Sequence, residues 1–84
     1  MKETAIVEFC NINKGSRVEI EVPLDITAND LVLALNEAYQ LGMNVEDIFS
    51  CYLVAENPIC FLRGNKTLKT MGIRNGSLII YKRD

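Results

Sequence analysis

The feature that most constrains the fold is the stretch from Thr67 to Tyr81, TLKTMGIRNGSLIIY, in a chain of 84 residues. Its apolar residues Leu68, Met71 and Ile73 recur at spacings of three and two, which suits a single helical turn that caps a core. Asn-Gly then supplies residues that tolerate positive φ, so the chain can turn sharply into a strand. A final strand as apolar as LIIY is expected in the middle of a sheet, with the earlier strands placed around it.

Two alternating segments near the N-terminus, residues 5–9 and 17–22, predict a pair of half-buried strands. The turn formers between them predict a hairpin, and Pro23 should end the second strand because it cannot donate a ladder hydrogen bond. The side chains expected to face the core are Ala5, Val7, Phe9, Val18, Ile20 and Val22.

A helix follows the hairpin. Thr27 stands at the N-cap position, and Asp30 three residues later suits the positive end of the helix. Apolar residues at helical spacing predict a helix from Ala28 to about Leu41, with one side covering a sheet. Gly42 is expected to form the C-cap.

Two further strands are predicted at residues 50–55 and 59–62, joined by the turn Glu56-Asn57-Pro58. The order is therefore β-β-α-β-β-short helical turn-β, and the last strand must pair with the first to keep the sheet continuous. This is an α+β fold of the β-grasp type, with a five-stranded mixed sheet packed on one main helix. Residues 1–84 are expected to form a single domain.

Composition excludes several classes of function. The net charge of −2 comes without a basic stripe, so nucleic acid is not an expected partner. No apolar stretch approaches the roughly 20 residues that span a bilayer, and MKETAIVEFC does not resemble a secretory signal. The three cysteines, Cys10, Cys51 and Cys60, are scattered and odd in number, which favours reduced thiols. A soluble, cytoplasmic protein without direct membrane insertion is expected.

Catalysis is not expected either. The chain has no histidine, which removes imidazole-based triads, and Glu19 and Glu21 lie on an outward strand face. A [2Fe–2S] cluster needs four cysteine ligands, and a metal held by Cys51 and Cys60 is the less favoured interpretation of that pair. No enzyme activity, cofactor or metal is predicted.

The alternation of side chains predicts a binding surface. If Leu78 and Ile80 point to the core, then Ile79 and Tyr81 point away from the helix, beside the outward residues of the third strand. The alternative is that a one-residue slip reverses the faces of these strands, which are apolar on both sides. Leu33, on the polar side of the helix, is a second candidate contact. The predicted protein-binding residues are Tyr52, Val54, Ile79 and Tyr81, with Leu33 apart from them.

Over nearly its whole length the chain resembles ubiquitin-like proteins, because TLKTMGI followed by a two-residue turn and a strand matches their last segment. Within that group it looks most like the small YukD/EsaB family of bacterial type VII secretion systems, through VEFCNINKGSRVEIEVPLDI and GIRNGSLII. The resemblance implies a non-enzymatic, cytoplasmic accessory that binds a protein component of the secretion machinery.

The C-terminal residues bear on the kind of ubiquitin-like protein. Modifiers and sulfur carriers need a flexible Gly-Gly end, whereas this chain ends Tyr81-Lys82-Arg83-Asp84. We therefore expect that it is not conjugated. The alternatives are a sulfur-carrier or modifier-type protein activated at its C-terminus, and a self-associating structural module that forms a weak homodimer through a sheet edge or the apolar patch.

Overall fold

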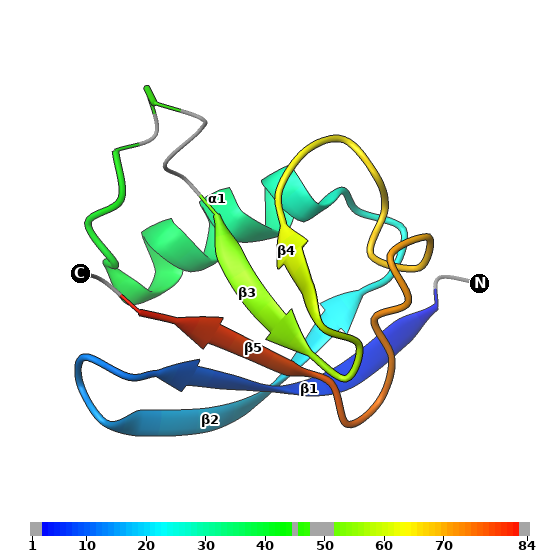
Figure 1. Cartoon of the computed structure of the whole chain (residues 1–84), viewed down its shortest axis with the longest axis horizontal. Helices are drawn as coiled ribbons and strands as arrows, with labels where there is room; N and C mark the ends of the chain where they lie inside the picture. The colour runs from blue at the N-terminus through cyan, green and yellow to red at the C-terminus, as the bar shows by residue number, and fades with distance from the viewer. Residues whose placement is uncertain (1–2, 45, 48–51, 83–84) are drawn as a thin grey trace.

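The computed structural model describes residues 3–44, 46–47 and 52–82, and this part of the chain forms a sheet with one helix (Figure 1). Residues 50 and 51, predicted as the start of the third strand, lie outside the described residues. In chain order the elements are β1 (Thr4–Asn11), β2 (Ser16–Pro23), α1 (Ala28–Tyr39), β3 (Leu53–Glu56), β4 (Cys60–Leu62) and β5 (Leu78–Tyr81).

The sheet has the strand order β2-β1-β5-β3-β4. The last strand, β5, is central: it pairs in parallel with β1 and antiparallel with β3. β1 and β2 form the predicted antiparallel hairpin, and β3 and β4 form a second one. The predicted β-grasp arrangement and the central position of the last strand are both confirmed.

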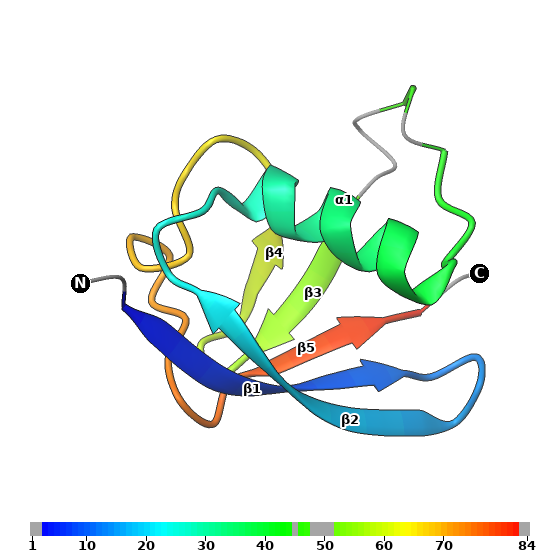
Figure 2. The same cartoon turned by 180° about the vertical axis from the view of Figure 1, so that it is seen from behind.

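The core lies between α1 and one face of the sheet, while the other face carries no helix (Figures 1 and 2). Every strand contributes at least one side chain that is almost fully buried, and α1 contributes a stripe along its inner side. Full burial of one such aliphatic or aromatic side chain stabilises the fold by about 1.5–3 kcal/mol. The largest of these residues are Val7, Phe9, Val32, Leu53, Leu62, Leu68 and Ile79.

The segment before β5 closes one end of the core as predicted. The N–H of Ile73 donates to the carbonyl of Leu68 at 3.0 Å, and both side chains are buried, at 3% and 0% exposure. Gly76, with φ of 88°, turns the chain into β5, where Asn75 Oδ1 accepts a hydrogen bond from the N–H of Ile6 at 2.8 Å. The turn residues therefore also tie β5 to β1.

The faces of β5 are the reverse of the prediction. Ile79 and Tyr81 point into the core, with exposures of 0% and 7%, and Leu78 and Ile80 lie on the helix-free face. The cause lies just before the strand, at Ser77. This residue is fully buried, and its Oγ donates to the carbonyl of Asn57 at 2.6 Å. Because side chains alternate along a strand, residues 79 and 81 must follow residue 77 inward.

Tyr81 fits in the core because its polar end has a partner. The hydroxyl donates to the carbonyl of Leu41 at 2.8 Å, and Leu41 is itself buried just after α1. A buried tyrosine without such a partner would lose the hydrogen bonds that its hydroxyl makes with water. The placement of Ile79 and Tyr81 on the exposed face was therefore wrong.

The start of α1 is as predicted, but its end is not. Thr27 Oγ1 accepts a hydrogen bond from the N–H of Asp30 at 3.1 Å, which confirms the N-cap. The helix ends at Tyr39, and the left-handed C-cap residue is Gln40, with φ of 52°, and not Gly42. The N–H groups of Gln40 and Leu41 both bond to the carbonyl of Asn36, which closes the helix before the glycine is reached.

Burial falls along β2 towards the hairpin turn. The strand ends at Pro23 as predicted, and Val22 is 2% exposed, but Ile20 is half-buried and Val18 is 39% exposed. All three pair with core-facing residues of β1, so the predicted face is right. Figure 2 shows that the turn end of the hairpin extends beyond α1. β2 is also an edge strand, so Val18 has a neighbouring strand on one side only.

Candidate functional site: the helix-free face of the sheet

The described residues carry no obvious centre for chemistry. Among them, no group of three or more cysteine, aspartate or glutamate side chains is close enough to hold a metal ion. Within the same ranges, every buried side-chain nitrogen or oxygen has a hydrogen-bond partner. No helix in the described part of the chain is long and apolar enough to cross a membrane. The surface features that stand out lie on the sheet face opposite α1.

A row of apolar side chains crosses this face from β4 to β1. Val54 in β3 lies opposite Phe61 of β4 on one side and Ile80 of β5 on the other, and Ile80 lies opposite Cys10 of β1. Cross-strand partners share a face of the sheet. Since the residues on both sides of Val54 in β3 are buried under the helix, this row must point away from it. We call Phe61, Val54, Ile80 and Cys10 the apolar row.

The β4 end of the row is aromatic and exposed. Phe61 is 56% exposed and Tyr52 is 38% exposed, and their rings meet edge to face with centroids 5.5 Å apart. The guanidinium of Arg63 lies 5.5 Å from the Phe61 ring centre and 5.9 Å from that of Tyr52. Contacts of this kind hold the rings and the cation in one arrangement on the surface.

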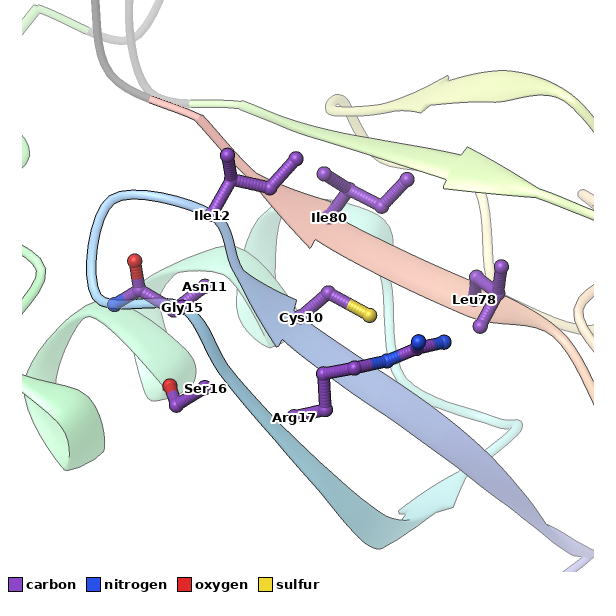
Figure 3. Close-up of a pocket in the computed structure, with 8 residues that line it drawn as sticks. All are labelled: Cys10, Asn11, Ile12, Gly15, Ser16, Arg17, Leu78 and Ile80. Atoms are coloured by element: carbon purple, nitrogen blue, oxygen red, sulfur yellow. The ribbon is translucent and has the colours of Figure 1, made fainter.

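The β1 end of the row is hollowed into a shallow groove of about 360 Å³. Figure 3 shows Ile12 and Ile80 on one side of the groove, Cys10 at its centre and Arg17 reaching along the other side towards Leu78. Ile12 is 53% exposed, which leaves an apolar edge open to solvent. The groove can receive one apolar side chain of a partner.

A second row, parallel to the first, is acidic. Leu78 of β5 lies between Glu56 of β3 and Glu8 of β1, and Glu8 lies opposite Glu19 of β2. Like charges placed directly opposite each other destabilise a strand pair. Arg17 forms an ion pair with Glu8. The hydrogen bond between the two side chains and the negative charge of the Glu8 carboxylate raise the pKa of the Arg17 guanidinium. We call Glu56, Leu78, Glu8 and Glu19 the acidic row.

The predicted site residues divide into three groups. Tyr52 and Val54 lie on the helix-free face as expected. Leu33 is 36% exposed on α1, on the opposite side of the molecule, so it forms no common surface with them. Ile79 and Tyr81 belong to the core, and their places on the helix-free face are taken by Leu78 and Ile80.

Sequence reasoning did not name Phe61, Cys10 or Ile12 as binding residues, although the alternation in the first strand places Cys10 on the face opposite Phe9. A signal existed for Phe61: Leu62 was predicted as a core residue, and alternation along β4 then turns Phe61 outward. No comparable signal exists for Ile12, because it follows β1 in a turn whose geometry is not encoded in a strand pattern. Whether any of these residues contacts a partner stays a prediction.

Solved structures of known proteins share this architecture. The structure aligns over 95% of its length with 89% of a ubiquitin-like domain from tubulin-binding cofactor B, with a TM-score of 0.73 and 22% identity. It aligns over 99% with 91% of the C-terminal ubiquitin-like domain of mouse tubulin-specific chaperone e, with a TM-score of 0.70 and 14% identity. For the UBL domain of Plasmodium falciparum Dsk2 the coverage is 93% and 97%, the TM-score 0.60 and the identity 19%.

Sequence comparison adds nothing to these structural matches. No protein-family model matches the chain, and no curated protein matches it. Identities of 14–22% support a shared fold and not a shared partner or activity. The comparisons therefore identify the architecture of this chain as that of a ubiquitin-like β-grasp domain.

Proposed function

We propose that this domain is a non-enzymatic protein-binding module that contacts its partner through the helix-free face of the sheet. The observation that carries the proposal is the apolar row, which runs unbroken across four neighbouring strands. Phe61 is the most exposed member of the row, Val54 and Ile80 are half-buried and Cys10 is buried. A large contiguous apolar patch on a protein surface marks a site of interaction.

The composition of the face supports the proposal. Aromatic and arginine side chains are enriched at the centres of protein interfaces, and Tyr52, Phe61 and Arg63 are already held against each other in the free protein. Because these side chains are partly ordered before binding, less conformational entropy is lost when a partner covers them. The groove beside Ile80 adds a depression for an apolar anchor.

We further propose that the partner belongs to a bacterial type VII secretion apparatus and that the domain acts there as a cytoplasmic accessory. This proposal rests on the resemblance of VEFCNINKGSRVEIEVPLDI and GIRNGSLII to the YukD/EsaB family. In this reading the domain docks on a cytoplasmic or membrane-anchored component of the secretion machine, and the acidic row helps to select that component.

A pull-down from the native host tests the docking face. The double variant Val54→Asp, Phe61→Ser changes the β3 and β4 half of the apolar row and should lose the secretion component that the wild type retains. Ile59→Ser is the matched control, because Ile59 is 86% exposed but lies outside the row. Leu33→Ser tests in the same pull-down whether the exposed side of α1 contacts the partner. Equal retention by the double variant and the control would exclude the helix-free face as the docking site.

A second experiment tests the secretion role itself. Deleting the gene in its host should reduce the export of type VII substrates, measured by mass spectrometry of the culture supernatant. The wild-type gene and the Ile59→Ser gene should restore export, whereas the double variant should not. Unchanged export after deletion would rule out the secretion role and leave the docking proposal to the pull-down.

A further inference from the structure

The helix-free face carries a concentration of acidic residues. Its strand residues carry four carboxylates and one guanidinium, and Arg63, which follows β4, adds a second guanidinium at the far end of the face, for a net charge of −2. The charged strand residues are Glu8, Glu19, Glu21 and Glu56 against Arg17.

Most of this charge lies beside the apolar row. Glu8 and Glu19 face each other across β1 and β2, and Arg17 forms an ion pair with Glu8. A cation placed over Glu19 would relieve the repulsion between the two carboxylates. The charge pattern therefore favours a partner with basic side chains next to its apolar ones.

The backbone geometry of a sheet face indicates which secondary structure the partner has. Strand N–H and C=O groups point sideways within the sheet, so a partner lying on the face receives no backbone hydrogen bonds from it. An extended peptide there would leave its own backbone unpaired when it is covered. A helix satisfies its backbone internally, and it would pack on this face as α1 packs on the other.

The dimensions of the apolar row suit a short helix. From Phe61 on β4 to Cys10 on β1 the row crosses three gaps between strands, a length of about 14 Å at about 4.8 Å per gap. At a rise of about 1.5 Å per residue, about ten residues of helix cover that distance. The groove lined by Ile12, Ile80 and Leu78 then lies where one apolar side chain near the helix end can enter.

We propose that the partner segment of this face is an amphipathic helix whose apolar stripe lies along the apolar row and whose flanking lysine or arginine side chains lie over the acidic row. This inference rests on the proposed docking function and specifies the chemistry of the partner.

Two synthetic peptides of about 18 residues test it, with leucine at positions i, i+4, i+7 and i+11 of a helix. In one peptide the positions beside the stripe are lysine, and in the other they are glutamate. Each is titrated into the isotope-labelled 84-residue chain, and amide shifts are followed by NMR. We expect the lysine peptide to shift the amides of Val54, Phe61 and Ile80 saturably and to bind about tenfold tighter than the glutamate peptide at low salt. Added salt should reduce that difference.

Matched variants distinguish the contribution of the acidic row to peptide binding from that of the net charge of the protein. Glu19→Gln with Glu56→Gln should weaken binding of the lysine peptide severalfold. Glu37→Gln with Glu46→Gln changes the net charge equally at exposed positions outside the strands and should leave the affinity unchanged. A lysine peptide of the same composition, with its apolar residues at scrambled positions, should not shift the amide signals of the apolar row.

The outcomes distinguish this inference from the docking function on which it rests. Equal binding of both peptides at the row would overturn the cationic partner and leave docking intact. If the scrambled peptide causes shifts as large as those from the designed peptide, charge alone explains the binding. That result would also overturn the inference of an amphipathic helix. Concentration-dependent shifts of the same amides without peptide would assign the face to a second copy of the chain. If neither peptide shifts the row, the inference is wrong, and docking is judged by the pull-down.

Discussion

The same substitution at two neighbouring positions of β5 tests which side of the central strand faces the core. Ile79→Thr and Ile80→Thr both replace a β-branched residue with another, so the intrinsic strand preference changes little. Ile79 is 0% exposed beneath α1, whereas Ile80 is partly exposed on the helix-free face. The structure predicts that only the first change is severe.

The magnitude follows from the burial of each side chain. At position 79 the core loses about two carbon groups at about 0.8 kcal/mol each, and a hydroxyl is buried at a cost of about 1–3 kcal/mol. We expect a destabilisation of about 3–4 kcal/mol, a large part of the roughly 4–13 kcal/mol typical of a domain of this size. At position 80 the hydroxyl can reach water, and the expected cost is about 1 kcal/mol or less.

Urea unfolding followed by circular dichroism measures both variants against the wild type. The unfolding midpoint should fall strongly for Ile79→Thr and slightly for Ile80→Thr, with unchanged m-values. In thermal unfolding, about 3 kcal/mol corresponds to a melting temperature lower by about 12–24 °C for a domain of this length. Equal destabilisation, or a larger effect at position 80, would refute the assigned faces of β5 and with them the position of the apolar row.

Three further predictions concern single side chains. Tyr81→Phe should destabilise the fold by about 1–3 kcal/mol in urea unfolding, because the buried carbonyl of Leu41 loses its donor; an unchanged midpoint would show that the hydroxyl is not buried. Thr27→Ala should cost about 1 kcal/mol and lower the helical signal on heating, since the N–H of Asp30 loses its cap. Burial raises the pKa of the Cys60 thiol, so stability linked to this group should be complete below its unfolded pKa and decline as the pH rises towards the folded pKa. For the same reason alkylation of Cys60 should be slower in the folded protein than in urea, and equal rates would contradict the burial.

Much of the fold could be predicted because its signals are local. The alternation in residues 5–9, the N-cap at Thr27 and the turn formers Asn75 and Gly76 each act within a few residues, and the structure contains all three features. The strand order followed from chain connectivity, since β5 could complete the sheet only by pairing with β1. The end of α1 was predicted less well, because Gly42 and Gln40 can both adopt a left-handed conformation.

The candidate site was predicted only in part. Tyr52 and Val54 were placed on the correct face by taking Leu53 and Ala55 to point into the core, and the structure buries both of these residues. The error at β5 arose because all four of its residues are apolar, so the pattern is compatible with either face. The exposure of Val18, predicted as a core residue, likewise depends on tertiary structure, because β2 is an edge strand of the folded sheet.

Sequence pattern alone is enough to specify the element types, their order and a sheet with an apolar last strand at its centre. The contacts that choose between the two faces of that strand are non-local. Ser77 is held inward by the carbonyl of Asn57, twenty residues earlier, and the Tyr81 hydroxyl donates to the carbonyl of Leu41, forty residues earlier. A period of two defines which residues share a face but not which face meets the core. Tertiary contacts such as these hydrogen bonds make Ile79 a core residue and leave Ile80 on the surface proposed for docking.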